Sequence, residues 1–331
     1  MTEKEYYSEK RVSSSSLKWF ETSPLFFRKM LDKEIEQETK RYFEIGKKIH
    51  MKILEPNEFD KNYIYLKYNT PKSENQKKFC EDYISSKAKS KDEKLVYAYK
   101  NNYSSDKLSD EKVLEKAKET HKDLTKYITY LRKRAEVKDV LTYTDNTLIN
   151  ECDRLAHDHV AASSLLFITD PFANVEQFNE QVVFFNWMGV QCKSMLDRIV
   201  IDHTNKVIKL VDIKTTINLG DFAHSFEEFS YYRQMAFYWG AILNFLKDER
   251  FKEYVNPNIG NTLLNYSKET YIVGFQKGDL PECRVFSINE NWLQRGLDEI
   301  EEILPKIKWH FDNNQWEHRK EYYDNNGIEI L

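Results

Sequence analysis

The chain has 331 residues, enough for one large domain or two ordinary ones. Its formal net charge of −4 excludes a protein that is basic overall, so any surface that binds nucleic acid must be local. The scarcity of Gly and Pro, 9 and 7 residues, excludes a collagen-like or loop-rich chain, and the lack of an apolar run of ~18–20 residues excludes a membrane helix. The four cysteines form no C-x-x-C pair, which argues against a zinc or iron–sulfur cluster. Together with a polar N-terminus unlike a signal peptide, they predict a cytoplasmic protein with reduced thiols.

A helix is predicted over Arg41–Leu54, where Pro56 ends it. Its inward face is expected to carry Phe43, Gly46, His50, Ile53 and Leu54. A histidine on such a face is more often a hydrogen-bonded core residue than a metal ligand, so both interpretations of His50 stay open at this point.

Residues 72–141 are rich in Lys, with Tyr spaced among them, and they predict a helical region. Interleaved basic and aromatic side chains suit a nucleic-acid groove. A solvated helical face explains the same composition, and it is the simpler explanation for most of the individual lysines.

A helix over residues 144–168 is followed by a predicted run of antiparallel strands. Glu180–Trp187 is expected to be a strand, and Met195–Thr215 is expected to be a β-hairpin, with β-branched runs on both sides of a polar turn at residues 202–205. The chain therefore predicts at least three sequential strands in one sheet.

The end of this hairpin carries the residues that predict chemistry. Alternate side chains of a strand share a face, so Asp212 and Lys214 point the same way, and the hairpin brings Asp197 near them. Two carboxylates beside a lysine suit metal-assisted phosphodiester hydrolysis, in which Mg²⁺ or Mn²⁺ neutralises charge on the phosphate and the lysine positions the attacking water. Asp-x-Lys alone is usually a solvated surface pair, but the apolar run Val207–Val211 argues against a solvated edge.

One long amphipathic helix is predicted over Ser225–Lys247. Gln234 and Tyr238 are four residues apart and share a face of it. A buried aromatic stripe accounts for Tyr238, whereas a buried amide needs hydrogen-bond partners, so Gln234 is harder to explain as a core residue. The remaining predicted elements are two strands and a helix that packs back on the sheet, at residues 271–276, 284–288 and 291–311.

In this order the residues resemble the PD-(D/E)XK nuclease superfamily, and within it the phage and prophage exonucleases of the exonuclease VIII (RecE-like) type. The matching blocks are Ser15-x-Leu17 with Ser23-Pro24, Gly46-x-x-x-His50 with Leu54-x-Pro56-x-x-Phe59, Glu180, Asp197 with Asp212-Ile213-Lys214-Thr215-Thr216, Gln234-x-x-x-Tyr238, and Gly274-Phe275-Gln276-Lys277. The chain departs from many relatives just before the hairpin acid, where it has Ser194-Met195-Leu196 in place of a small residue and an arginine.

The resemblance implies an α/β fold with a restriction-endonuclease-like core, in which helices flank a central mixed β-sheet. It implies a single domain over residues 1–331, with the Lys-rich residues 72–141 as a helical insertion within it. That insertion would grip DNA or contact another subunit.

For the site, the resemblance implies Mg²⁺ or Mn²⁺ held by His50, Asp197, Asp212 and the backbone carbonyl of Ile213. It implies that catalysis depends on Lys214, Asp212, Asp197 and Glu180. The substrate would be held by Gln234 and Tyr238. Glu176 lies close to Glu180 in the sequence and is the competing candidate for that acidic position.

The activity that the resemblance implies is exonucleolytic hydrolysis of linear duplex DNA, 5′→3′, in phage-type recombination or DNA processing, inside a bacterial or phage-infected cell. Its partners would be double-stranded DNA ends, a strand-annealing recombination protein and further copies of the chain. Two alternatives stay open: an endonuclease of the same fold, and a catalytically silent DNA-binding or assembly protein. The acid–acid–lysine set argues against the silent protein, because buried charges without a metal repel one another or lose hydration.

Overall fold

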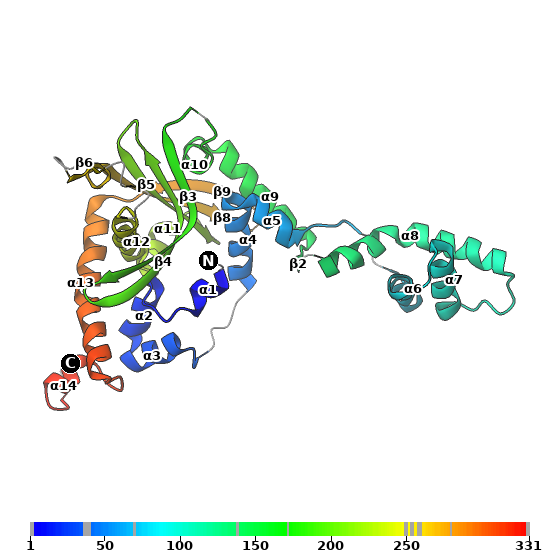
Figure 1. The fold of residues 1–331 in the computed structure, drawn as a ribbon, viewed down its shortest axis with the longest axis horizontal. Helices are drawn as coiled ribbons and strands as arrows, with labels where there is room; N and C mark the ends of the chain where they lie inside the picture. Colours follow the sequence, from blue (N-terminus) through cyan, green and yellow to red (C-terminus); the bar gives the residue numbers. More distant parts are fainter. Residues whose placement is uncertain are drawn as a thin grey trace. The chain divides into compact units, whose positions relative to one another are not determined.

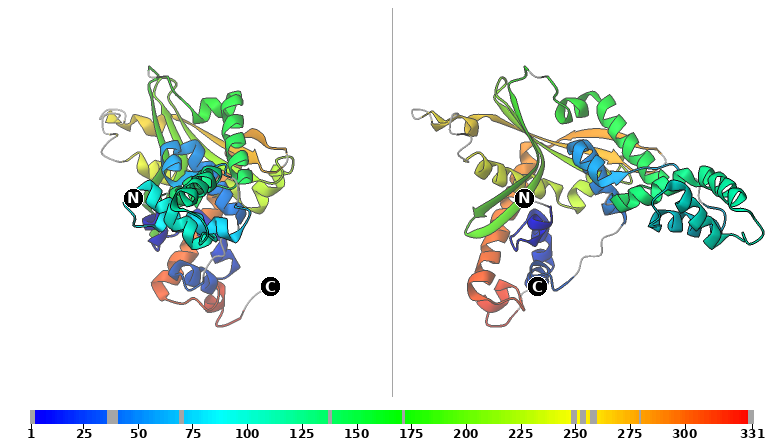
Figure 2. Two further views of the ribbon diagram at one scale, coloured as in Figure 1. Left: turned by 90° about the vertical axis from the view of Figure 1, so that its right-hand side faces the viewer. Right: turned by 45° about the vertical axis from the view of Figure 1, so that its right-hand side comes forward.

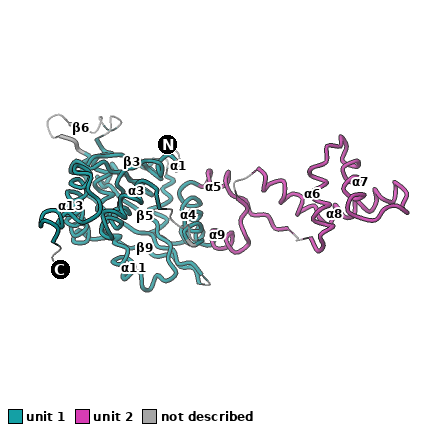
Figure 3. Tube along the Cα trace, turned by 90° about the horizontal axis from the view of Figure 1, so that it is seen from below, with its two compact units in different colours: residues 1–55, 150–331 teal, residues 56–149 magenta. Residues whose placement is uncertain are grey.

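The computed structural model describes residues 3–35, 41–68, 71–136, 139–170, 172–247, 251, 255–256, 260–278 and 280–328. The chain divides into two compact units, unit 1 made of residues 1–55 and 150–331 and unit 2 of residues 56–149 (Figure 3). The segment expected to be a helical insertion, residues 72–141, falls inside unit 2. Among the described helices, none is both long and apolar enough to cross a membrane.

Unit 1 is built on a five-stranded sheet in the order β3-β4-β5-β8-β9 (Figure 1). Only β5 and β8 run parallel in this sheet, and the other neighbouring strands are antiparallel. The strands are β3 (Val175–Trp187), β4 (Val190–Asp202), β5 (Val207–Thr216), β8 (Ser267–Gln276) and β9 (Glu282–Ser287). The predicted α/β fold with a central mixed sheet is confirmed, although β3 and β4 are longer than the sequence predicted.

The β4–β5 hairpin forms because two apolar strands flank a short polar turn. The Asp202 carboxylate closes that turn by accepting hydrogen bonds from the backbone N–H groups of Thr204, at 3.0 Å, and Asn205, at 2.9 Å. An aspartate that binds backbone amides two and three residues ahead stabilises a turn locally. The flanking strands then bury Ile199, Ile201, Ile208 and Leu210 in the main core of unit 1.

Two helices form successive layers beside the sheet. Helix α12 (Tyr231–Phe245) packs on β3 and β4, and α13 (Glu290–Asn313) packs on α12 (Figure 2). Gly296 permits the close crossing of these helices, because a Cβ atom there would lie 2.7 Å from the backbone oxygen of Tyr232. The remaining helices of unit 1 are α1 (Glu3–Ser8), α2 (Ser14–Thr22), α3 (Pro24–Asp32), α4 (Arg41–Leu54), α10 (Val160–Leu166), α11 (Phe222–Glu228) and α14 (Lys320–Asp324), and α9 (Tyr143–Asp158) begins in unit 2.

Three helical predictions differ from the structure. Residues 225–247 are not one helix, because Ser230 has left-handed dihedrals, φ 53° and ψ 44°, and separates α11 from α12. Residues 144–168 contain two helices, because the ring of His159 accepts the backbone N–H of Ala162 and caps α10. Phe43 is 55% exposed and so is not part of the inward face of α4, whereas Gly46, Ile49, Ile53 and Leu54 are buried.

Unit 2 has a hydrophobic core of its own. Three helices pack pairwise around it: α6 (Glu74–Ser85), α7 (Lys91–Asn102) and α8 (Asp110–Glu136). Their shared core includes Phe79, Leu95, Ala98, Val113, Leu124 and Ile128. Helix α5 (Pro56–Asn62) and a two-residue parallel pairing between β1 (Tyr63–Ile64) and β2 (Asp139–Val140) complete the unit.

Candidate active site

The candidate site forms where β4 and β5 stop pairing. Their ladder ends with Arg198 opposite Val211, and the next residues on the two strands are Asp197 and Asp212. Beyond this point the Ile213 N–H is free of the β4 ladder, and it donates a 2.7 Å hydrogen bond to Oδ2 of Asp197. The divergence of two neighbouring strands therefore brings both acids to one place.

Asp212 is the most enclosed carboxylate of the site. Its side chain is 1% exposed, and the Lys214 ammonium, 16% exposed, lies 2.6 Å from its Oδ2 atom. Oδ2 is thus paired with the ammonium, whereas Oδ1 has no hydrogen-bond partner among the described residues. Buried carboxylates normally have hydrogen-bond partners or bind a cation. The open coordination of Asp212 therefore fits a metal ion.

Helix α4 brings His50 to this point. Nδ1 of His50 lies 3.5 Å from Oδ2 of Asp197. Gly46 is one turn earlier on the same face of α4, and a Cβ atom there would lie 3.0 Å from Oγ1 of Thr215 on β5. The glycine therefore lets α4 approach β5 closely enough for His50 to reach the acids.

A buried arginine holds the end of α4 on the sheet. Arg198, 2% exposed, donates hydrogen bonds to the carbonyl of Leu165, to Oε1 of Gln177 and, at 2.7 Å, to Oδ1 of Asn179. Asn179 in turn donates a 2.7 Å hydrogen bond to the carbonyl of Leu54, the last residue of α4. This chain of contacts fixes the helix that carries His50 to the strands that carry the acids.

Glu180 joins His50 and Asp197 in a compact group. One ligand atom from each of these three residues lies within 4.8 Å of the others. On β3, Glu180 stands opposite Asp197 of β4, between the pairs Asn179–Arg198 and Gln181–Leu196. The backbone of Glu180 is left-handed, with a φ of 46°. A left-handed backbone is unfavourable for a glutamate, and residues in such conformations cluster at functional sites. The competing candidate Glu176 contacts His203 instead, at 2.8 Å.

Burial and neighbouring charges set the protonation of the site. Burial, helped by the Lys214 ammonium, lowers the pKa of His50 to about 4, so its imidazole is neutral near pH 7 and free to bind a metal. Burial also raises the pKa of Asp197 and raises that of Asp212 to about 6. Burial opposes the charge on Lys214, but the two carboxylates outweigh it and raise the lysine pKa. The site therefore holds excess negative charge that it stabilises poorly by itself.

Helix α12 closes the site from another side. Gln234 donates a 2.7 Å hydrogen bond to the hydroxyl of Tyr238. This bond provides the partner that the side-chain amide of Gln234 needs on an inward face of the helix. Burial, together with the charges of Asp212 and Asp197, raises the pKa of Tyr238 well above its ordinary value.

Sequence reasoning missed Tyr231. The Lys214 ammonium lies 5.0 Å from the centre of the Tyr231 ring, within the range of a cation–π contact. The only signal in the sequence was the row of aromatic residues at the start of the expected helix. That signal did not show that Ser230 breaks the helix and places Tyr231 at its first turn.

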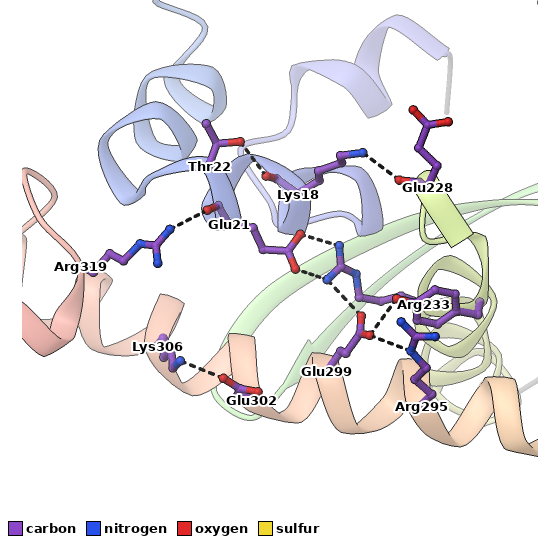
Figure 4. Close-up of polar contacts among 11 residues, drawn as sticks. Lys18, Glu21, Thr22, Glu228, Arg233, Arg295, Glu299, Glu302, Lys306 and Arg319 are labelled. Carbon is purple, nitrogen blue, oxygen red and sulfur yellow. Dashed lines mark hydrogen bonds and ion pairs between the residues drawn. The ribbon is translucent and has the colours of Figure 1, made fainter. Parts of the chain in front are cut away.

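A buried ion pair anchors α12 to its neighbours (Figure 4). Arg233 is 3% exposed, and its guanidinium binds both carboxylate oxygens of Glu21 on α2, one of them at 2.7 Å. The same guanidinium lies 3.3 Å from Oε2 of Glu299 on α13. Because Gln234 follows directly, the pair helps to fix the part of α12 that faces the acids.

We expect Arg233→Met to lower the free energy of unfolding by about 2 kcal/mol, because it removes several charged hydrogen bonds from a buried position. The loss is not larger because the carboxylates that bind Arg233 are partly exposed to solvent. Urea denaturation measures this. Arg295→Met is the matched control, since Arg295 also binds Glu299 but its side chain is 49% exposed, and we expect it to cost less than about 1 kcal/mol. Equal losses in the two variants would contradict an anchoring role for Arg233.

We expect Gly46→Val to weaken Mn²⁺ binding by about 10-fold or more, because the added side chain pushes α4 away from Thr215 and displaces His50. Calorimetric titration measures the affinity. Thr215→Ala removes the atom that the new side chain meets, so the double variant should recover part of the loss, with a coupling energy of about 0.5–3 kcal/mol. Wild-type affinity in Gly46→Val would show that the close approach is unimportant.

The donor set fits a hard divalent cation. A compact group combines a neutral imidazole, His50, with the carboxylates of Glu180 and Asp197, and Asp212 follows the end of the β4–β5 ladder beside them. Oxygen-rich sites with an imidazole suit Mg²⁺ or Mn²⁺ better than a soft metal. Oδ1 of Asp212, which has no hydrogen-bond partner among the described residues, leaves room for a further positive charge.

Comparison with known proteins places this geometry in a family. Residues 13–324 match a family model described as "PDDEXK-like domain of unknown function (DUF3799)". A crystal structure from Eubacterium rectale, described as a "Putative exonuclease", is similar in fold, with a TM-score of 0.50 and 15% sequence identity over 100% of this chain and 94% of that one. No curated protein matches the chain. Because the family model spans nearly the whole sequence, the chain belongs to the DUF3799 family of PDDEXK-like domains, and so to the PD-(D/E)XK superfamily.

Proposed function

We propose that this protein is a divalent-metal-dependent deoxyribonuclease that hydrolyses phosphodiester bonds at the site between β4, β5 and α4. The observation that carries the proposal is the buried Asp212 carboxylate, whose Oδ2 pairs with the Lys214 ammonium at 2.6 Å while its Oδ1 has no hydrogen-bond partner among the described residues. Stability alone gives no reason to bury such a carboxylate. A phosphodiesterase site does, because it must offer a cation negative ligands and offer the phosphate a positive group.

In this proposal His50, Glu180, Asp197, Asp212 and the carbonyl of Ile213 hold Mg²⁺ or Mn²⁺. The bound cation would neutralise charge on the phosphate oxygens and lower the pKa of a coordinated water. The Lys214 ammonium, held by Asp212 and the Tyr231 ring, orients the attacking water and stabilises the charge of the transition state. Gln234 and Tyr238 position the DNA beside these groups.

The finer proposal is an exonuclease of the exonuclease VIII (RecE-like) type that degrades linear duplex DNA 5′→3′ for recombination or DNA processing. The order of the sequence blocks supports it, from Gly46-x-x-x-His50 through Asp212-Ile213-Lys214 to Gln234-x-x-x-Tyr238. The similar fold is that of a protein described as a "Putative exonuclease". We further propose that a strand-annealing protein receives the product and that the chain works as a homo-oligomer in the cytoplasm.

The test is to incubate the protein with linear duplex DNA labelled at one 5′ or one 3′ end, with Mg²⁺, Mn²⁺ or EDTA. We expect release of nucleotides with either metal and none with EDTA. Early release of the 5′ label would support the proposed polarity. Covalently closed circular DNA of the same sequence separates the two nuclease activities, because an endonuclease cuts the circle and an exonuclease leaves it intact. Lack of hydrolysis of every substrate at saturating metal would overturn the proposal.

A further inference from the structure

Unit 2 is the part of this chain in which basic residues outnumber acidic ones. Residues 56–149 contain 20 Lys and Arg against 16 Asp and Glu, whereas the whole chain contains 50 against 54. Unit 2 also contains ten of the 21 tyrosines. The unit that lacks the candidate active site is therefore basic and rich in tyrosine, while unit 1 is acidic.

Within unit 2 the positive charge is concentrated in the second half of α8. The first half, Asp110–Asp123, has five acids and four lysines, as expected for an ordinary solvated helix with alternating charges. The second half, Leu124–Glu136, has four Lys and Arg and a single acid, Glu136 at its end. The basic residues of this half, Lys126, Arg132, Lys133 and Arg134, are all exposed. Solvation alone explains the first half of the helix but not this change in composition.

Three tyrosine rings gather beside this basic half. Tyr68 stacks on Tyr130 with ring centres 4.1 Å apart, and Tyr130 stacks on Tyr127 at 5.7 Å. All three rings are partly exposed. Burial and the hydroxyl of Tyr130 raise the pKa of Tyr68, and Arg134 is close enough to oppose that shift. Lys126 and Arg134 are four residues before and four residues after Tyr130 on α8, so both share its face of the helix. The cluster is therefore an aromatic surface flanked by cations of α8.

We infer that this surface, formed by Tyr68, Tyr127, Tyr130, Lys126 and Arg134, binds single-stranded DNA. Lysine and arginine neutralise phosphates, and exposed tyrosine rings stack with unpaired bases. Single strands fit better than duplex, because bases inside a duplex are not available to stack on a side chain. The inference goes beyond the proposed hydrolysis, since it concerns binding by unit 2 without metal.

The test uses the full chain with EDTA present, so that no hydrolysis occurs. Binding of a fluorescent 20-nucleotide oligothymidine is followed by anisotropy at several salt concentrations. The charge-reversed variant is Lys126→Glu with Arg134→Glu. Its matched control is Lys112→Glu with Lys116→Glu, which makes the same change in net charge at exposed positions in the first half of the same helix.

We expect Lys126→Glu/Arg134→Glu to weaken binding about 10-fold or more at low salt and to reduce the slope of log K against log salt by about 1.4, or ~0.7 per phosphate contact. The control should change affinity by less than about 3-fold. Equal weakening by both double variants would show attraction by net charge alone and would overturn the inference. So would failure of the wild-type chain to bind the oligonucleotide.

A separate variant tests the aromatic part. Tyr130→Ala should weaken single-strand binding by about 5-fold or more, because stacking is worth ~1–3 kcal/mol per base, while Tyr130→Phe should keep wild-type affinity. Circular dichroism checks that both variants are folded. Duplex binding as tight as single-strand binding, with no effect of Tyr130→Ala, would overturn the assignment to single strands. Because this assay contains EDTA and measures binding alone, a failure of the nuclease proposal leaves a distinct result here.

Discussion

Lys214→Ala is expected to reduce the rate of DNA hydrolysis by at least about 10²–10³-fold, the loss typical when one positioned electrostatic group is removed from a transition state. The ammonium lies 2.6 Å from Oδ2 of Asp212 and over the ring of Tyr231, so its position is fixed before substrate arrives. Initial rates on linear duplex DNA at saturating Mg²⁺ measure the effect. Mn²⁺ should still raise the melting temperature of the variant, because the lysine is not one of the proposed ligands.

Lys209→Ala is the matched control for this variant. Lys209 is on the same strand, β5, but it is five positions before Lys214, so it lies on the other face of the sheet. We expect it to hydrolyse DNA at close to the wild-type rate. Wild-type activity in Lys214→Ala would remove the chemical basis of the proposed mechanism.

The parts of the fold that the sequence predicted well are those with a strong local pattern. The β4–β5 hairpin has apolar runs on both sides of a polar turn, and α4 has the predicted bounds, Arg41–Leu54. Both elements are specified by neighbouring residues. The parallel partner of β5, by contrast, comes from residues 267–276, and no local pattern indicates which distant strand completes a sheet.

The helix breaks could not be predicted because tertiary contacts decide them. Ser230 is neither Gly nor Pro, and a left-handed conformation is uncommon for it, yet it separates α11 from α12. The aromatic packing around it provides the reason, since Phe226 contacts Tyr232 and Phe229 contacts Tyr231. Helical periodicity continues across the break, so the sequence predicts one helix there.

The candidate site was predictable in its residue types and less so in its geometry. Alternation along β5 placed Asp212 and Lys214 on one face, and the structure has them in contact. The position of His50 depends on Gly46 packing against Thr215, about 170 residues later, which only the resemblance indicated. The left-handed backbone of Glu180 has no signal in the sequence. The roles of all these residues remain the proposal that the variants test.

Asp212→Asn is expected to abolish hydrolysis and, without metal, to make the protein more stable at pH 8 than the wild type. Burial raises the pKa of Asp212 to about 6 from an ordinary value of 3.8. The folded protein therefore holds this proton more tightly than the unfolded chain does. The folding stability that this proton provides begins to fall as the pH rises above about 4, and it is lost completely above about pH 6. A shift of this size corresponds to about 3 kcal/mol. Asparagine does not ionise, so the variant avoids that loss.

Urea denaturation of both proteins at pH 4, 6 and 8 with EDTA measures the difference. The free energy of unfolding of Asp212→Asn should exceed that of the wild type by a margin that grows as the pH rises. Asp202→Asn on the same hairpin is a control for which the opposite pH dependence is expected. The amides of Thr204 and Asn205 outweigh burial and lower the pKa of Asp202. Replacing this carboxylate should therefore destabilise the protein more at pH 8 than at pH 4. A difference between wild type and Asp212→Asn that does not depend on pH would contradict the assignment of the charge to Asp212.

Addition of Mn²⁺ should then reverse the order of stability. At about 100 times its dissociation constant a ligand stabilises the folded state by about 2.7 kcal/mol, which the wild type should gain and Asp212→Asn should largely lose. Equal stabilisation of the two proteins by Mn²⁺ would mean that the cation binds without Asp212. The reversal is the strongest expected consequence of the site, because a carboxylate that is unfavourable in the metal-free protein becomes favourable only when a cation is bound to it.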